Sequence, residues 1–296
     1  MFMSEASQTI TSFRDKWQQN RRLAFDETSK DGSDIFAWIL GRNGFASGTA
    51  LQEYLAKKNR ILDAGCGNGR VTALLHKFAP ESAELVGVDL TAAEVARENL
   101  AGYPRVSIVQ VDLLGDLSQL GLFDFIYCQE VLHHTADPKA AFLNVCQRLS
   151  PGGEIAIYVY KIKAPLREHA DDFVRERLSN LPYEEAMVAM RQVTELGRVL
   201  SALDTRVTVP DVKVLGIDAG TYDVQRLIYH FFLKCFWNPE LGAEENAAIN
   251  YDWYHPQLCT RHTPAEIESW FADANLRVVQ QCVDHYGITM RGARIE

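Results

Sequence analysis

With 296 residues, of which 47% are hydrophobic, the chain can bury one large α/β core with added helices, or a core with a small cap. The formal net charge of −9 disfavours general electrostatic adhesion to nucleic acid or to an anionic membrane. No apolar run reaches the length of a membrane span, and the first residues lack a basic segment followed by a hydrophobic one, so we expect a cytoplasmic protein.

Residues 1–58 are rich in aromatic side chains and are predicted to form an N-terminal helical cap segment. Breaks in the helices are expected at residues 31–33 and 41–44. Large apolar side chains are usually buried, so packing against the edge of a sheet is the favoured interpretation. Arg42 and Asn43, in the second break, are the polar residues of interest here.

Residues 60–70 combine a short apolar strand, a carboxylate and three alternating glycines, and the run opens directly into a helix. Glycine lets the backbone turn tightly near a ligand, and a helix start offers unpaired N–H groups. This pattern predicts a nucleotide-cofactor site with Gly65, Cys66 and Gly67 in the turn. Asp63 would repel a pyrophosphate but would hold a ligand that carries an ammonium, such as S-adenosylmethionine, and this argues against an NAD site.

The next three strands also end in polar residues. Asp89 lies about twenty residues after the last glycine of the turn, where a carboxylate can accept both ribose hydroxyls, and Leu90 follows it. Asp112 could accept an adenine amino group, with Leu113 as an apolar cover for the ring. Gln129 ends the fourth strand, where the reactive end of the cofactor should emerge. Open α/β sheets bind ligands at these carboxyl ends.

These motifs, in this order, resemble those of class I S-adenosylmethionine-dependent methyltransferases. The glycine motif, the acids, the segment Val131–Pro138 and the fifth-strand segment Leu149–Ile157 all match, and together they cover roughly residues 60–160. The resemblance implies methyl transfer from a sulfonium, with S-adenosylhomocysteine as product. It also implies that the cofactor contacts Asp63, Gly65, Cys66, Gly67, Asp89, Leu90, Asp112, Leu113 and Gln129.

The predicted fold class is α/β, because strands and helices alternate through residues 59–160, the expected cofactor-binding core. The resemblance implies a doubly wound, Rossmann-like sheet of seven mostly parallel strands, the last of them antiparallel. Residues 161–262 form a helical insertion, and residues 263–296 should complete the core. Beyond residue 160 we expect helices at 167–178, 183–203, 222–237 and 263–271, and strands at 276–285 and 288–294.

The insertion exceeds the minimal fold by about a hundred residues. In the family that the chain resembles, insertions at this place usually form a lid over the substrate, and long structured insertions tend to be functional. A homodimer interface is the alternative, because residues 227–237 are strongly apolar.

Methyl transfer needs a base only if the nucleophile arrives protonated. His133 and His134 follow the fourth strand, and histidine titrates near neutrality, so either could take a proton from a hydroxyl or amine acceptor. The favoured alternative is that both shape the loop without acting as a base. Glu130 is a nearby candidate, with hydrogen bonding to the cofactor or the loop as its better role.

A second candidate cluster combines residues 250–256 with Arg261 and His262. Its aromatic rings could line a substrate pocket in which His255 and His262 handle the acceptor. A hydrogen-bonded structural loop is the close alternative. Cys259 and the two histidines are irregularly spaced, and the six cysteines show no paired spacing, so no metal site is predicted.

Lys161, Lys163 and Arg167 leave the fifth strand together and could bind a carboxylate or phosphate on the acceptor. A solvated helix start, neutralised by nearby acids, is the favoured alternative.

The sequence therefore predicts an enzyme that methylates oxygen or nitrogen, with carbon as a further option, on a small molecule or biosynthetic intermediate. A tRNA or protein methyltransferase is the alternative within enzymes, which the acidic balance opposes. A non-catalytic S-adenosylmethionine-binding regulatory protein is the alternative from another class, and a nicotinamide dehydrogenase is opposed by Asp63. No nucleic-acid or membrane partner is expected.

Overall fold

The computed structural model describes residues 3–295, and the chain divides into two compact units. We call them the sheet unit, which comprises Trp17–Lys161 and Thr260–Glu296, and the helical unit, which comprises Met1–Lys16 and Ile162–Cys259. Across residues 3–295, every helix is too short or too polar to span a bilayer.

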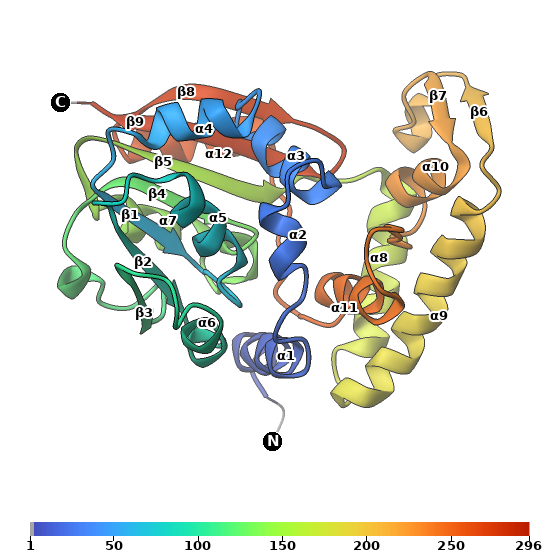
Figure 1. Ribbon diagram of the computed structural model, residues 1–296. Coiled ribbons are helices and arrows are strands. Elements are labelled where there is room, and N and C mark those ends of the chain that lie inside the picture. Colours follow the sequence, from blue (N-terminus) through green and yellow to red (C-terminus); the bar gives the residue numbers. More distant parts are fainter. Residues whose placement is uncertain (1–2, 296) are drawn as a thin grey trace. The chain divides into compact units, whose positions relative to one another are not determined.

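Seven strands form the sheet unit's central layer, in the order β3-β2-β1-β4-β5-β9-β8 (Figure 1). Neighbours from β3 to β5 pair in parallel, whereas β9 runs antiparallel to both β5 and β8. The predicted seven-stranded, mostly parallel sheet with an antiparallel last strand is confirmed. The strands are β1 (Arg60–Ala64), β2 (Glu84–Asp89), β3 (Val106–Gln110), β4 (Phe123–Gln129), β5 (Leu149–Tyr160), β8 (Leu276–Val283) and β9 (Gly287–Arg294).

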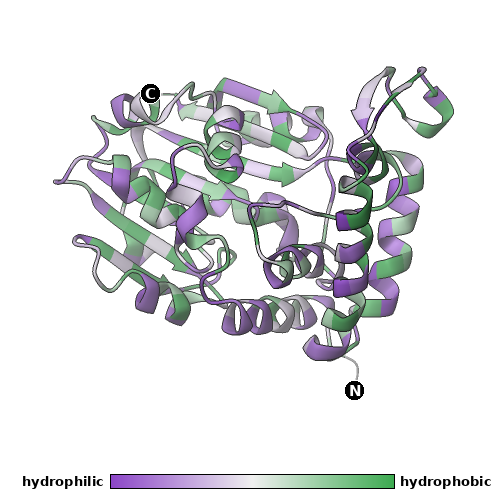
Figure 2. Cartoon of the chain, turned by 45° about the vertical axis from the view of Figure 1, so that its right-hand side comes forward, coloured by the Kyte–Doolittle hydropathy of each residue, from purple (hydrophilic) through white to green (hydrophobic). Residues whose placement is uncertain are grey.

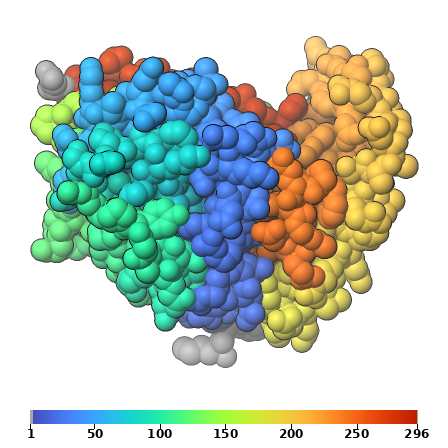
Figure 3. Space-filling view, viewed as in Figure 1, coloured from blue at the N-terminus to red at the C-terminus, as the bar shows by residue number. Residues whose placement is uncertain are grey.

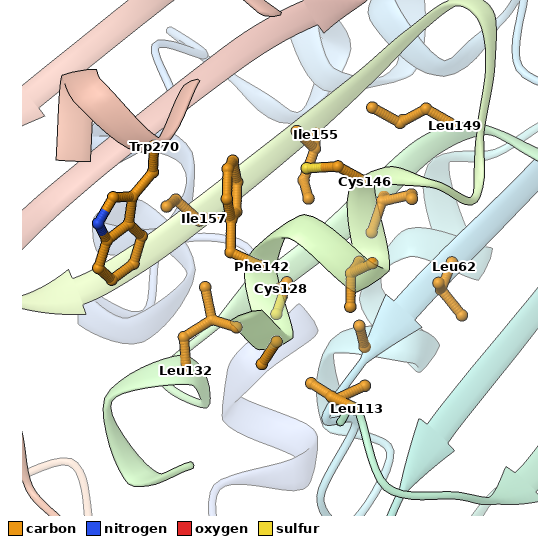
Figure 4. Packing of buried hydrophobic residues seen from close by; sticks show 14 of the residues in the cluster. Leu62, Leu113, Cys128, Leu132, Phe142, Cys146, Leu149, Ile155, Ile157 and Trp270 are labelled. Carbon is orange, nitrogen blue, oxygen red and sulfur yellow. The ribbon is translucent and has the colours of Figure 1, made fainter. Parts of the chain in front are cut away.

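Helices cover both faces of this sheet because alternate strand residues point to opposite sides. Leu62 faces α7 (Pro138–Cys146) and α12 (Pro264–Asp273), in a core that includes Phe142 and Trp270 (Figure 4). Ile61 faces α3 (Asp34–Arg42), α4 (Gly48–Leu55) and α5 (Arg70–Phe78). Hydrophobic segments run along the central strands, whereas the helices carry alternating hydrophobic and hydrophilic bands (Figure 2).

Helix starts in this unit follow local capping rules. Asp137 and Thr263 each accept a hydrogen bond from a backbone N–H three residues later, and a proline occupies the first helical position after each. The smaller elements of the unit are α2 (Phe25–Ser29), α6 (Ala93–Asn99), η1 (Ser118–Leu120) and η2 (Leu132–His134).

The first 58 residues are shared between the two units. Helix α1 (Glu5–Gln19) begins in the helical unit, whereas α2, α3 and α4 belong to the sheet unit. In Figure 3 the blue surface of residues 20–50 adjoins the cyan surface of α5, in agreement with the contacts that α2 and α4 make with α5. The segment that the sequence grouped as one cap is therefore divided at residue 16.

The helical unit consists mainly of α8 (Pro165–Leu178), α9 (Tyr183–Ser201), α10 (Val224–Phe231) and α11 (Ala243–Tyr254). A short antiparallel hairpin of β6 (Arg206–Val209) and β7 (Gly220–Asp223) and the turn η3 (Lys213–Leu215) lie between α9 and α10. The sequence analysis missed this hairpin. It also extended α10 six residues too far, and residues 250–254, for which a structural loop was one of two interpretations, are the end of α11.

Asparagine side chains explain why α10 ends early. Asn250 accepts from the Phe236 N–H (2.8 Å) and donates to the Phe236 carbonyl (3.1 Å), while Asn246 accepts from the Asn238 N–H. This segment also crosses α9 closely, because a Cβ at Gly197 would lie 2.4 Å from the Cys235 carbonyl oxygen. Phe236 and Asn238 thus satisfy their backbone groups through asparagine side chains instead of a helix.

Candidate functional site

The turn between β1 and α5 has a backbone conformation that glycine adopts without strain. Gly65, Gly67 and Gly69 have φ angles of 81°, 55° and 86°. A Cβ at Gly65 would lie 2.3 Å from Val131 Cγ2, and one at Gly67 would lie 2.8 Å from Trp17 Cζ2. The turn is therefore closely packed, and larger residues are excluded from it.

Asp63 lies at the carboxyl end of β1 and is only 4% exposed. Its Oδ2 accepts a hydrogen bond from Thr72 Oγ1 at 2.6 Å. Burial raises the pKa of Asp63 to about 7, although the hydrogen bond from Thr72 and the charge of Arg70 act in the opposite direction. A cationic group at this position would stabilise the carboxylate.

Asp89 joins the glycine turn to the loop after β2. Its Oδ2 accepts from the Gly67 N–H (2.9 Å), and its Oδ1 accepts from the N–H groups of Thr91 and Ala92 (both 2.8 Å). Three charge-assisted hydrogen bonds fix the orientation of this carboxylate before any ligand arrives. Its position at the end of β2 is the one predicted for the ribose acid.

The other residues that were predicted to contact the adenosine part of the cofactor differ in solvent exposure. Asp112 is exposed and accepts from the Leu114 N–H at 2.9 Å, and Leu90 is half-buried at the end of β2. Cys66 and Leu113 are buried, at 5% and 6% exposure. Leu113 lies in the core beneath the sheet (Figure 4), which favours a packing role over the predicted cover for a ring.

Gln129 at the end of β4 forms a reciprocal amide pair with Asn43. Gln129 Nε2 donates to Asn43 Oδ1 at 2.6 Å, and Asn43 Nδ2 donates to Gln129 Oε1 at 3.3 Å. Both side chains are buried. The residue after α3 is thereby fixed at the carboxyl edge of the sheet, where the reactive end of a ligand is expected.

Two arginines converge on Glu130, the residue after β4. Arg70 Nη2 lies 3.0 Å from Glu130 Oε2, and Arg42 Nη1 lies 3.6 Å from Oε1. Arg42 is buried against the Trp38 ring, 3.6 Å from its centroid. Glu130 itself has a φ of 65°, which is uncommon outside glycine. The sequence analysis noted Arg42 and Glu130, but nothing in their spacing predicted that they meet.

Three of the four predicted acceptor-handling histidines gather at the carboxyl end of β5. The His133 ring lies 3.7 Å from the Tyr160 ring and 4.4 Å from the His134 ring, centroid to centroid. The His262 N–H donates to the Tyr160 carbonyl, and the Thr260 N–H donates to the His133 carbonyl. His262 Nδ1 also lies 2.9 Å from Glu266 Oε1. This cluster belongs entirely to the sheet unit.

His255 belongs to the helical unit instead, so the sequence grouped it with His262 across a unit boundary. Its Nδ1 lies 2.9 Å from Ser12 Oγ and its Nε2 lies 3.0 Å from the Leu181 carbonyl. The ring stacks on Tyr251, and burial lowers the pKa of His255. With both nitrogens engaged, the geometry favours a structural role.

Metal-binding geometry is not found in the described part of the chain, where no three His, Cys, Asp or Glu side chains gather as they would around an ion. Cys259, His255 and His262 are thus not grouped as a ligand set. The six cysteines are all free thiols, and five of them are buried.

Comparisons with known proteins agree with this arrangement. A family model described as a methyltransferase domain matches residues 42–281. The chain is 31% identical to an uncharacterized methyltransferase of Schizosaccharomyces pombe over 133 residues, 42% of this chain and 46% of that protein. It is 35% identical to a ubiquinone biosynthesis O-methyltransferase of Idiomarina loihiensis over 101 residues, 32% of this chain and 40% of that protein. The chain thus spans less than half the length of either relative.

Among solved structures, the carbon methyltransferase CurJ shares the fold with a TM-score of 0.51 at 13% sequence identity, over 96% of this chain and 59% of that one. The family match extends over most of the chain and includes the glycine turn, Asp89 and the end of β4. On this match, the chain belongs to the class I S-adenosylmethionine-dependent methyltransferase family.

Proposed function

We propose that this protein transfers a methyl group from S-adenosylmethionine to an oxygen or nitrogen atom, with carbon as a further option, on a small molecule or biosynthetic intermediate. The observation that carries the proposal is the buried Asp63 carboxylate beside the glycine turn. Such a group is costly without a counter-charge, and the amino-acid end of S-adenosylmethionine supplies an ammonium.

The residues of the sheet unit fit this cofactor in kind and in order. The glycines allow the positive φ angles of the turn, the oriented Asp89 carboxylate suits a pair of ribose hydroxyls, and the exposed Asp112 suits an amino group. Gln129 and the arginine pair at Glu130 suit the polar amino-acid end. We assign cofactor binding to residues 59–160 and 263–296, and acceptor recognition to residues 161–262.

The cofactor, when bound, supplies a methyl group already activated on a sulfonium. The chain must then hold the acceptor in line and exclude water, and positioning of this kind is worth about 7–11 kcal/mol in well-oriented systems. A protonated acceptor also needs a base. We rank His134 ahead of His133 for that role, because its side chain keeps 9% of its surface exposed against 0%.

The name of the Idiomarina loihiensis relative supports an oxygen acceptor on a small molecule, and the formal charge of −9 opposes a nucleic acid. A protein acceptor is also compatible with the family, so the acceptor class needs a direct test. Association into a homodimer through the helical unit stays a separate hypothesis that sedimentation can examine.

The test is methyl transfer by the full chain from isotopically labelled S-adenosylmethionine to panels of phenols, amines and carboxylic acids, with tRNA and protein extracts as further acceptors. Label in a small molecule, with stoichiometric S-adenosylhomocysteine, is the expected result. Label found only in RNA or protein would overturn the acceptor class. Tight cofactor binding without transfer to any acceptor would favour a regulatory protein.

A further inference from the structure

Three cationic side chains of the helical unit surround a single indole ring. Lys234 Nζ lies 4.8 Å from the centroid of Trp253, the Arg167 guanidinium carbon lies 5.1 Å from it, and Lys163 Nζ lies 5.5 Å from it. Lys234 and Arg167 are buried, at 6% and 2% exposure, and Lys163 is half-buried. We call these three residues the cation cluster.

The nearest carboxylates already have partners inside the unit. Asp171, fully buried, accepts from Arg167 Nε at 2.7 Å and from the Tyr254 hydroxyl at 2.9 Å. Asp252 lies 2.8 Å from Lys16 Nζ. These contacts stabilise Arg167 and Lys16.

Lys234 has a neutral hydrogen-bond acceptor. Its Nζ donates to the Ile249 carbonyl at 3.1 Å, and within the described chain no carboxylate lies at ion-pair distance from it. Burial lowers the pKa of Lys234 to about 7, with Arg167 acting in the same direction and Asp252 against it. The titratable and charged groups around it are Arg167, Asp171, Asp252, Tyr254 and Cys259.

Burying an ammonium without a counter-ion is unfavourable, and a hydrophobic residue of similar length would avoid this cost. The cation–π contact with Trp253 offsets only part of it. Lys163 and Arg167, at the start of α8, and Lys234, which follows α10, nevertheless bring like charges to one ring. This arrangement is explained if a negatively charged group completes it.

We propose that the cation cluster binds a carboxylate or phosphate group, so that the methyl acceptor of this protein is an anionic small molecule. The identification of the ligand as the acceptor rests on the proposed function, whereas the anion site is independent of it. Lys163 and Lys234 would bind the anion as flexible point charges, and Arg167, held by Asp171, would add a fixed positive field.

The test is titration of the full chain with sodium phosphate and, separately, sodium succinate at constant ionic strength, followed by tryptophan fluorescence. Trp253→Phe identifies which tryptophan reports the change. We expect saturable binding that Lys234→Met weakens at least tenfold. Lys213→Met removes an exposed lysine of the same unit, 91% exposed at its side chain, and should bind as the wild type does.

Protonated Lys234 binds an anion better than neutral Lys234, so the affinity should be about tenfold higher one pH unit below the pKa of its ammonium than one unit above it. Saturation by phosphate alone would assign a phosphorylated ligand, and saturation by both anions a carboxylate-tolerant site. Equal binding to Lys234→Met and wild type, or no binding to either, would overturn the proposal. If Lys234→Met unfolds, Lys163→Met at the half-buried position provides the same comparison.

No step of this experiment uses S-adenosylmethionine. Failure of the anion site would therefore leave the methyltransferase proposal intact, and failure of methyl transfer would leave a measurable anion site.

Discussion

Among residues 3–295, the sheet unit and the helical unit each contain a buried titratable side chain for which no ion pair is found. In the sheet unit this group is Asp63, whose Oδ2 accepts a hydrogen bond from the Thr72 hydroxyl. In the helical unit it is Lys234, which donates to the Ile249 carbonyl. Burial moves both pKa values to about 7, upward for the acid and downward for the lysine.

The difference between these two groups lies in what surrounds them. Asp63 lies at the end of a strand, beside a turn built from consecutive residues, whereas Lys234 lies in the segment after α10 and meets its neighbours through tertiary packing. Both arrangements are costly in the free protein and become favourable when a ligand of the opposite charge arrives. A buried charge without an internal counter-ion thus indicates the sign of a ligand.

The largest effect on ligand binding is expected at Asp89, whose hydrogen bonds hold the glycine turn beside Asp63. Asp89→Ala removes the acceptor of three backbone N–H groups and of the proposed ribose contact. We expect a loss of about 3 kcal/mol in binding free energy, or roughly a hundredfold in affinity for S-adenosylmethionine. Calorimetric titration measures it, with Asp116→Ala, an exposed acid of the same unit, as the control. Unchanged affinity would refute the ribose assignment.

His255 provides a contrast to Asp63 and Lys234, because it is a buried titratable group whose two ring nitrogens both contact groups of its own unit. His255→Ala removes the hydrogen-bond partner of the Ser12 hydroxyl and of the Leu181 carbonyl. We expect the free energy of unfolding to fall by about 2 kcal/mol with no change in cofactor affinity, as seen in urea denaturation and calorimetry. His169→Ala, at an exposed position of the helical unit, is the matched control. Lost turnover with full stability would instead restore the acceptor-handling role.

Asp63 predicts a pH dependence of binding. Only the ionised carboxylate attracts an ammonium, and in the free protein its pKa is raised by burial to about 7. As the pH falls below that value, the affinity for S-adenosylmethionine should fall by up to about tenfold per pH unit. Calorimetry across this range measures the slope, which Asp63→Asn should abolish. A pH-independent affinity in the wild type would show that Asp63 does not face the ammonium.

Lys234 predicts a pH dependence of the free energy of unfolding, which is small for each pH unit. Its pKa is lower in the folded chain than in the unfolded one, so the unfolded chain binds more protons above pH 7, and stability should rise with pH in that range. Relative to Lys234→Met, the wild type should gain about 1 kcal/mol per pH unit. Thermal unfolding of both proteins from neutral to alkaline pH measures this difference. Parallel curves would mean that Lys234 titrates normally.

The fold of the sheet unit follows closely from local sequence signals. The strands β1 and β2 lie where the sequence shows a short apolar run that ends in an acid, Asp63 or Asp89, followed by a turn. Thr263, as the N-cap, and Pro264, as the first helical residue, likewise mark the start of α12. Glycine, proline and capping residues act over a few positions, so a pattern of neighbours is sufficient to predict them.

The parts that the sequence did not predict depend on distant contacts. Nothing local in Phe232–Trp237 forbids a helix, and the segment leaves it because Asn250 and the space beside Gly197 accept it in another conformation. The sequence grouped Lys163 with Arg167, but it did not predict that Lys234 joins them at Trp253 or that Arg42 meets Glu130, for the same reason. His255 and His262 are close in the chain yet belong to different units, and nothing in the sequence between them indicated the boundary.

The amide pair between Asn43 and Gln129 also has an evolutionary consequence. Each side chain is both donor and acceptor to the other, and both are buried. A change at Asn43 leaves two polar atoms of Gln129 unmatched, whereas a change at Gln129 leaves Asn43 Oδ1 unmatched, since Asn43 Nδ2 also donates to the Ile39 carbonyl. The two positions, 86 residues apart in sequence, are therefore expected to change together among homologues. Covariation of positions 43 and 129 in an alignment of homologues would indicate that the contact between the N-terminal segment and the end of β4 is maintained among them.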